Sequence, residues 1–192
     1  MDMPQVGLPL ALTRVCLNAM LQSFPQSPLP IDAVLEMAEI DDGKKLADPL
    51  FHHRYACDAP DFPCHVFAFA RNGGERGPLL CYIHFTPQGD LLLGGGACVD
   101  NRALRLLSSE SRDAIRAVGG LYRHALAWSV QHFSDRYQAI FGYCGDALAE
   151  RVDLDVGFRK TRHEHLLVHF RDGVSSSGQE RLIEQAHAVG PF

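Results

Sequence analysis

The spacing of hydrophobic residues predicts helices near the N-terminus and then an irregular stretch. In residues 8–24 apolar side chains recur at helical spacing, and a shorter stretch, 31–40, shows a second amphipathic pattern. Pro25, Pro28 and Pro30 lie between the two patterns and end the first helix. From residue 41 to 63 the chain is polar and rich in Asp, His and Pro. The sequence therefore predicts two helices followed by an irregular segment.

Strand patterns then follow in quick succession. Three apolar runs, 65–71, 78–85 and 91–99, are separated by the turn signals Asn72-Gly73-Gly74 and 86–90. Three strands with such short connections favour an antiparallel meander. The third run contains Gly94-Gly95-Gly96, which indicates a bulge or a close approach of another group to the backbone.

The last third of the chain alternates between helix and strand. A polar connection, 100–113, leads to a helical pattern at 121–133, and an apolar run at 139–144 predicts a buried strand. Asp146 is a suitable N-cap for the next helix, and Gly157 is a suitable stop. A strand at 161–173 and a helix at 178–189 complete the pattern. We therefore expect an α/β (α+β) fold with a mixed, mostly antiparallel sheet flanked by helices.

Composition narrows the range of functions. The chain has 192 residues, 46% of them hydrophobic and 21% charged, as in an ordinary globular domain. The net charge of -5 gives no electrostatic footprint for nucleic acid or an anionic membrane, and no apolar run is long enough to span a bilayer. No signal peptide is expected, and the six cysteines read as buried thiols in a cytoplasmic protein. We expect one domain over 1–192, with N-terminal helices and an irregular segment (1–64), a core (65–170) and a C-terminal helix (171–192).

A glycine pair, Gly119-Gly120, begins the helix at 121–133 and is the first chemical signal. Glycines at a helix N-terminus let backbone N–H groups approach a phosphate, and Arg116 lies close enough in sequence to add a cation. A plain loop explains the same glycines.

The order of elements over about residues 65–170 resembles the GCN5-related N-acetyltransferase (GNAT) superfamily. That family's pyrophosphate loop reads Arg/Gln-x-x-Gly-x-Gly/Ala, and here Arg116 and Gly119 fill the first and fourth positions, with Leu121 at the normally small sixth position. The connection before this loop is longer than usual in the family, and Arg102 is an alternative cation.

A second family motif, Asn-x-x-Ala-x-x-Leu-Tyr-x-x-x-Gly-Phe, is matched in frame and without a gap. The matching residues of this chain are Asp146, Ala149, Val152, Asp153, Gly157 and Phe158. The resemblance implies a divergent acetyltransferase that uses acetyl-CoA as co-substrate. It implies contacts to acetyl-CoA from Cys98, Val99, Arg116, Val118, Gly119, Gly120, Leu121, Tyr122, Asp146 and Ala149.

Asp153 stands where the family often has the tyrosine that reprotonates the leaving thiolate. An ordinary aspartate, with a pKa of about 4, is ionised at neutral pH and donates a proton poorly unless burial raises its pKa. A solvated helix carboxylate is the simpler interpretation of Asp153. Tyr143 and Tyr122 are the nearest phenols in the sequence, and each is a candidate for the missing acid or a structural tyrosine.

The reaction that the resemblance implies is direct attack of an amine on the thioester. Backbone N–H groups near Cys98 and Val99, on a strand that splays from its neighbour, would hold the thioester carbonyl. Asp100 and His84 are candidate bases. Together with Tyr143 and Asp153, Asp100 completes the set of catalytic candidates.

Soft metal ligands occur in two groups, but no metal is expected. The first group is His52, His53, Cys57, Cys64 and His65, which lack the paired spacing of a zinc site. The second is His163, His165 and His169, which would share one face of the predicted last strand. Cys144 has no visible His–Asp partner, so a buried thiol is the better interpretation.

Three classes of function remain open at this point. The first is an acyl-CoA-dependent N-acyltransferase acting on a small-molecule or peptide amine, and the second is a non-catalytic GNAT-like protein that binds CoA or another ligand. A metal-dependent protein is the third. The sequence identifies no acceptor, and a homodimer stays open.

Overall fold

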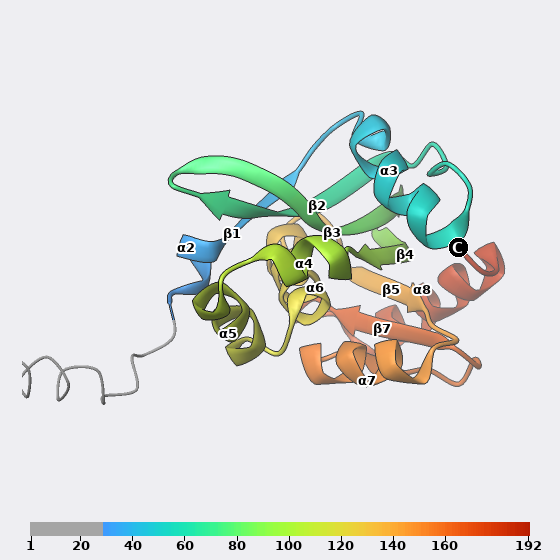
Figure 1. The fold of residues 1–192 in the computed structure, drawn as a ribbon. Helices are drawn as coiled ribbons and strands as arrows, with labels where there is room; N and C mark the ends of the chain where they lie inside the picture. The colour runs from blue at the N-terminus through green and yellow to red at the C-terminus, as the bar shows by residue number, and fades with distance from the viewer. Residues whose placement is uncertain (1–28) are drawn as a thin grey trace, which may run out of the picture.

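One seven-stranded sheet with helices on both faces organises the described part of the chain, residues 29–192 of a computed structural model (Figure 1). The strand order is β1-β2-β3-β4-β5-β7-β6. Five neighbouring pairs are antiparallel, and β4 and β5 are parallel. The predicted mixed, mostly antiparallel sheet flanked by helices is confirmed. The helix predicted at 8–24 lies outside the described residues.

The elements follow one another along the chain with short connections. In order they are α2 (Ile31–Val34), β1 (Leu35–Glu39), α3 (Lys44–Tyr55), β2 (Cys64–Asn72), β3 (Glu75–Gln88), β4 (Leu91–Val99), α4 (Asn101–Leu106), α5 (Ser109–Ala117), α6 (Leu121–Phe133), β5 (Ala139–Tyr143), α7 (Ala147–Val156), β6 (Arg159–Lys160), β7 (Leu166–Phe170) and α8 (Ser176–Val189).

The helix predicted at 31–40 is wrong over most of its length. Only Ile31–Val34 are helical, and Leu35–Glu39 form the edge strand β1, antiparallel to β2, with Leu35 opposite Ala70. Leu, Glu, Met and Ala all favour helices, so intrinsic propensity pointed the wrong way. Pairing with the exposed edge of β2 outweighs a preference of a few tenths of a kcal/mol per residue.

The irregular segment predicted at 41–63 contains a helix, α3. Ala47, Leu50 and Phe51 are its buried residues, at the spacing of one helical face. Pro49 and the polar composition hid this stripe in the sequence. The polar connection at 100–113 likewise contains helix α4 and most of α5, each capped at its N-terminus by a side chain, Asp100 and Ser108 respectively.

The long strand predicted at 161–173 is much shorter than expected. Strand β7 covers Leu166–Phe170, and Thr161 to His165 form a turn in which His165 has a left-handed φ of 64°. Of the three histidines expected on one strand face, only His169 lies in the strand. The other late elements, α6, β5, α7 and α8, agree with the sequence prediction to within a few residues.

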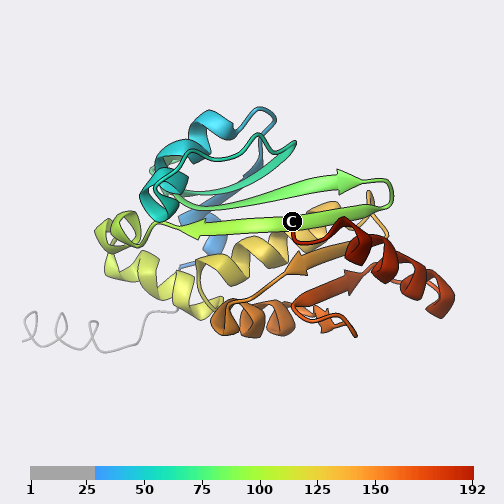
Figure 2. The ribbon, with the colours of Figure 1, turned by 90° about the vertical axis from the view of Figure 1, so that its right-hand side faces the viewer.

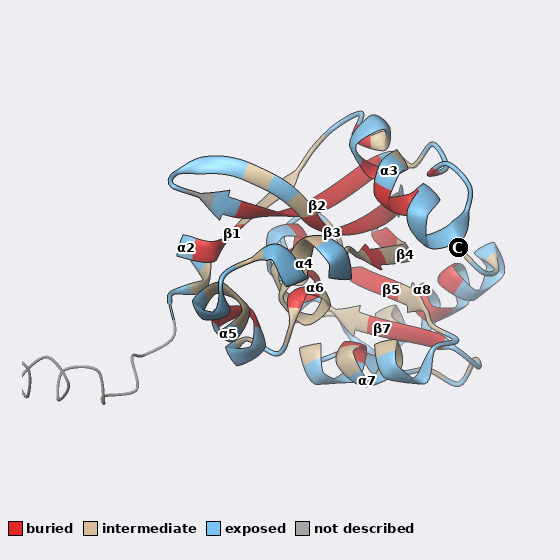
Figure 3. Cartoon of the chain, viewed as in Figure 1, coloured by how far each residue is buried: buried red, intermediate tan, exposed pale blue. Residues whose placement is uncertain are grey.

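Three packed clusters cover the two faces of the sheet. Helices α5, α6 and α7 pack on one face, over residues such as Ile83, Phe85 and Ile140. The opposite face is covered by α3, over Phe67 and Tyr82, and by α8, over β4, β5 and β7. Figure 2 shows α3 and α6 on opposite sides of the sheet, and Figure 3 shows the buried residues concentrated along the strands.

None of the helices in residues 29–192 combines the length and the hydropathy that crossing a bilayer requires.

Candidate functional site

The parallel strands β4 and β5 separate halfway along β4. Their pairing begins at Leu91 opposite Ala139 and ends at Gly94 opposite Gly142, although β4 continues to Val99. Unpaired backbone on two adjacent strands therefore faces a common gap. The splay that the family resemblance implied near Val99 is present in the structure.

A bulge in β4 lies at the point where the strands part. On β3, Ile83 pairs with Ala97 and Phe85 pairs with Gly94, so His84 alone faces Gly95 and Gly96. The N–H of Gly96 donates to Nε2 of His84 at 2.7 Å. A Cβ on Gly95 would lie 2.0 Å from the same Nε2. The glycine run therefore makes room for the imidazole of His84. Its Nε2 accepts the N–H of Gly96 in place of a backbone carbonyl of the neighbouring strand.

His84 is unsuited to the role of catalytic base that the sequence suggested. Its ring is buried on the α3 face of the sheet and stacks on Phe62, with ring centroids 3.4 Å apart. Burial lowers the pKa of His84 to about 3, and the nearby His65 adds to this effect. Its Nδ1 is buried without a hydrogen-bond partner among the described residues. His84 shapes β4 and stays neutral.

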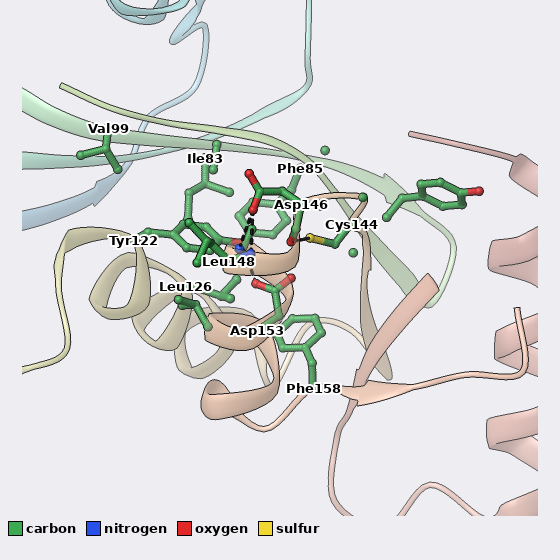
Figure 4. A pocket seen from close by; sticks show the side chains of 18 of the residues that line it. Ile83, Phe85, Val99, Tyr122, Leu126, Cys144, Asp146, Leu148, Asp153 and Phe158 are labelled. Carbon is green, nitrogen blue, oxygen red and sulfur yellow. Dashed lines mark hydrogen bonds between the residues drawn. The ribbon is translucent and has the colours of Figure 1, made fainter. Parts of the chain in front are cut away.

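A cavity of about 700 Å³ fills the gap between the strands and passes beneath α7. Its walls are β4 from Gly94 to Val99, β5 from Ile140 onward, the start of α7, and the end of α3. Apolar side chains of the α6 face, including Ile83, Phe85, Leu126 and Phe158, form its inner surface (Figure 4). An opening between splayed strands with an apolar lining suits an extended, mostly neutral chain.

Asp153 is the buried carboxyl of this cavity. It is only 4% exposed, so the interpretation as a solvated helix carboxylate is wrong. The hydroxyl of Tyr122, from α6, donates to Oδ1 of Asp153 at 2.7 Å. Burial raises the pKa of Asp153, and the hydrogen bond from Tyr122 only partly opposes that rise. A phenol and a carboxyl from two helices thus meet inside the cavity.

The same burial affects the neighbours of Asp153. It raises the pKa of Tyr122, with the charge of Asp153 and their hydrogen bond as further causes. It also raises the pKa of the Cys144 thiol, whose Sγ lies 3.3 Å from the carbonyl oxygen of Asp146. Tyr122 and Cys144 are therefore neutral around pH 7, and Asp153 is the group of this cluster that titrates at the lowest pH.

Asp146 fulfils its predicted role as the N-cap of α7. Its Oδ1 accepts the N–H groups of Leu148 at 2.7 Å and Ala149 at 3.2 Å. These two bonds lower the pKa of Asp146, and the positive charge of Arg54 contributes. Gly157, with a φ of 107°, ends the helix as expected. The motif-bearing stretch thus folds as a strand, cap, helix and stop.

A second pocket, of about 280 Å³, lies at the N-terminus of α6 and shares Val99, Asn101, Tyr122 and Val152 with the larger cavity. Gly119 and Gly120 have φ values of 85° and 101°, which only glycine adopts readily, and no side chain caps α6. Helices α4, α5, α7 and α8 all have side-chain caps. The free N–H groups of α6 therefore face a pocket that also contains three arginines, Arg112, Arg116 and Arg123.

Leu121 is one of the residues that line this pocket, and it is also part of the core. Its side chain is 4% exposed and packs in the core beneath α6. Arg116 is exposed on the last turn of α5 and pairs with Asp113. Arg123 donates to Asp155 at 3.0 Å and to the carbonyl of Val118 at 3.2 Å, so it lies beside the glycine loop.

Most of the remaining predicted site residues lie outside this cavity system, but Tyr143 is among the residues that line the larger cavity. Cys98 is buried among the α3 contacts, and Val118 is not among the lining residues of either pocket. The ring of Tyr143 packs near His165 and Phe192, in the cluster on the α8 side of the sheet, away from Tyr122.

Asp100 caps α4 and bonds to Arg102. Burial by itself would raise the pKa of Asp100, but these bonds outweigh it and lower the pKa, so Asp100 is a poor base. Arg102, the alternative cation, is held by this contact.

Neither histidine group forms a metal site among residues 29–192, where no cluster of three or more His, Cys, Asp or Glu side chains has suitable geometry. His65 bonds to the Tyr82 hydroxyl at 2.9 Å, and Cys64 bonds to Glu39 at 3.3 Å. His163 stacks on His187 and bonds to Glu184. These side chains join elements of the fold to one another.

Three features of the site were not predicted from the sequence. The end of α3, with His53, Arg54 and Tyr55, lines the larger cavity, but α3 itself was missed. Gly142 leaves open space on β5, because a Cβ there would meet no atom within 4 Å. Arg123 follows the glycine pair by one turn of helix, and that spacing was the signal available for it.

No protein-family model matches the sequence, and no curated protein does. Among solved structures, the ribosomal-protein-S18-alanine N-acetyltransferase from Escherichia coli matches with 10% identity and a TM-score of 0.47, over 74% of this chain and 97% of that one. A GNAT family acetyltransferase from Brucella melitensis in complex with acetyl-CoA matches with 12% identity and a TM-score of 0.38, over 71% and 87%. Similarity this low leaves the activity to be inferred from the cavity itself.

Proposed function

We propose that this protein is an N-acetyltransferase that transfers the acetyl group of acetyl-CoA to an amine. The observation that carries the proposal is the gap between β4 and β5, which ends at the buried Asp153–Tyr122 pair. A thioester placed in that gap would lie between strand backbone on one side and a proton donor on the other. The arginine-rich pocket at α6, which shares four lining residues with the cavity, supports a phosphate-bearing donor.

Each end of the donor would meet a different kind of surface. At the α6 N-terminus, free N–H groups and Arg112, Arg116 and Arg123 would bind the pyrophosphate. Along the gap, unpaired groups of β4 beyond Gly94 and of β5 beyond Gly142 would bind the amides of the pantetheine arm. The apolar lining around Phe85 and Leu126 would exclude water from the thioester.

Asp153 would act as the general acid. The neutral amine nitrogen attacks the thioester carbonyl and loses a proton to water as the C–N bond forms. The C–S bond breaks, and the carboxyl of Asp153 gives its proton to the leaving sulfur. Tyr122 would position that carboxyl through its 2.7 Å hydrogen bond. Asp153 acts only in its protonated form, which the burial-raised pKa makes more abundant than in an exposed aspartate.

Release of free thiol from acetyl-CoA tests this function directly. We expect an amine-dependent rate with at least one class of amine in a broad panel, and a rate lower by about 100-fold or more with Asp153→Asn at the same protein concentration. Acetyl-CoA binding without thiol release for any amine would instead support a non-catalytic CoA-binding protein. Neither binding nor release at millimolar acetyl-CoA would contradict both interpretations.

A further inference from the structure

We infer that the acceptor is a small amine that carries a carboxylate, and that Arg54 binds this carboxylate. This inference rests on the acetyltransferase function proposed above. The larger cavity has two ends: one opens to the pocket at α6, and the other is lined by His53, Arg54 and Tyr55 from the last turn of α3. Since the α6 end suits the phosphates of the donor, the α3 end remains for the acceptor.

A positively charged side chain distinguishes the α3 end from the rest of the cavity. Among the described residues that line the cavity, Arg54 is the only lysine or arginine. None of the ion pairs formed within residues 29–192 involves it, whereas Arg76, Arg102 and Arg136 each pair with a carboxylate. Its guanidinium carbon lies 5.8 Å from the centroid of the Tyr55 ring, so the two side chains are neighbours at this end of the cavity. A guanidinium has five N–H donors in a planar arrangement that matches a carboxylate.

A negative group, the carboxylate of Asp146, lines the same cavity as Arg54. The charge of Arg54 contributes to the lowered pKa of Asp146, after the hydrogen bonds from Ala149 and Leu148, so the two side chains interact electrostatically. Oδ1 of Asp146 caps α7, and no hydrogen bond within the described residues involves its Oδ2. One wall therefore offers a cation and the other a carboxylate oxygen. An acceptor with a carboxylate and an amine complements both walls.

The walls at this end also limit the size of the acceptor. Tyr55 reaches from α3 to β4, where its hydroxyl donates to the carbonyl of Ala97 at 3.4 Å. This contact connects two walls of the cavity beside Arg54. The pantetheine arm must share the same cavity of about 700 Å³, which favours an acceptor of the size of an amino acid.

Thiol release from acetyl-CoA, measured with a panel of amino acids, tests the inference. Each amino acid is compared with the amine that lacks only its carboxylate. We expect kcat/KM of the preferred amino acid to exceed that of its partner amine by about tenfold or more, as a charge-assisted contact would give. In Arg54→Gln this preference should disappear through a rise of about tenfold in KM for the amino acid, with kcat and the rate for the partner amine nearly unchanged. The matched control is Arg151→Gln, an exposed position on α7 outside the cavity lining, which should behave as wild type.

Two results would overturn the inference while leaving the proposed function intact. One is equal or better kcat/KM for the amines without a carboxylate, and the other is an equal effect of Arg54→Gln on both members of a pair. Absence of thiol release with every amine tested would instead contradict the acetyltransferase function. Urea unfolding of both variants shows whether a loss of rate reflects a loss of fold.

Discussion

Replacing Asp153 by asparagine is expected to lower kcat by about 100-fold or more while the protein remains folded. A positioned general acid contributes about 10²- to 10⁴-fold to a rate, and asparagine keeps the shape of the side chain without its acidic proton. The Tyr122 hydroxyl can still donate to the amide oxygen. Steady-state rates at saturating acetyl-CoA measure the effect, and Asp135→Asn, at an exposed turn beyond α6, is the matched control.

The same variant is expected to lose activity without losing stability. The folded-state pKa of Asp153 is raised, so its contribution to stability is complete below the unfolded pKa and is lost as pH rises through the folded pKa. At a pH above the folded-state pKa, the buried ionised carboxylate is therefore a cost that asparagine avoids, and the comparison is made there. Asp153→Asn should unfold in urea at an equal or higher midpoint than wild type, and a lower midpoint would mean that the lost activity reports misfolding.

The pH dependence of kcat tests whether Tyr122 acts on the pKa of Asp153. In wild type, kcat should fall as pH rises through the pKa of Asp153, since only the protonated carboxyl donates. The Tyr122 hydrogen bond opposes the rise in that pKa. Tyr122→Phe should therefore move the falling limb to higher pH, and Asp153→Asn should remove it. An unchanged limb in both variants would exclude this pair as the acid.

Gly95→Ala is expected to destabilise the protein by about 1–3 kcal/mol, the usual range for overpacking a well-packed site. The new Cβ would lie 2.0 Å from Nε2 of His84, on a ring already fixed between Gly96 and Phe62. Urea unfolding measures the change, with Gly142→Ala as the control, because its Cβ would meet no atom within 4 Å.

A double-mutant cycle isolates the cause of that effect. If the clash is with the imidazole, Gly95→Ala combined with His84→Ala should be less destabilising than the sum of the two single changes, by about 1 kcal/mol or more. Strict additivity, or a Gly95→Ala variant as stable as Gly142→Ala, would mean that His84 does not hold the bulge.

The helices and strands that could be predicted from the sequence are those whose buried hydrophobic residues recur at the regular spacing of a helix or a strand. Helix α6 and strands β2, β3 and β4 follow the predicted pattern because each packs an apolar face against the core. Strand β1 was predicted as a helix, because its residues favour helices and only its pairing with β2 makes it a strand. Helix α3 was missed because its apolar stripe is only Ala47, Leu50 and Phe51, interrupted by Pro49. Edge pairing and short stripes depend on tertiary contacts that local patterns do not contain.

Some residues of the candidate site could likewise be predicted from the sequence, and others could not. Asp146, Gly119 and Gly120 were predictable because capping and positive φ are local properties of the backbone. The Asp153–Tyr122 pair joins residues 31 positions apart from two helices, and no sequence pattern gives the burial that raises the pKa of Asp153. Arg54 entered the site only because α3 ends beside β4.

Acetyl-CoA binding to wild type and to Gly142→Phe, measured by titration calorimetry, tests most directly whether the gap between β4 and β5 is the donor site. Phenylalanine at this position would enter the open space of the cavity, and its Cβ would meet no protein atom within 4 Å, so the fold should persist in urea unfolding. We predict that wild type binds acetyl-CoA and that the variant binds at least about 100-fold more weakly. Equal affinity in the two proteins, with both folded, would contradict the account.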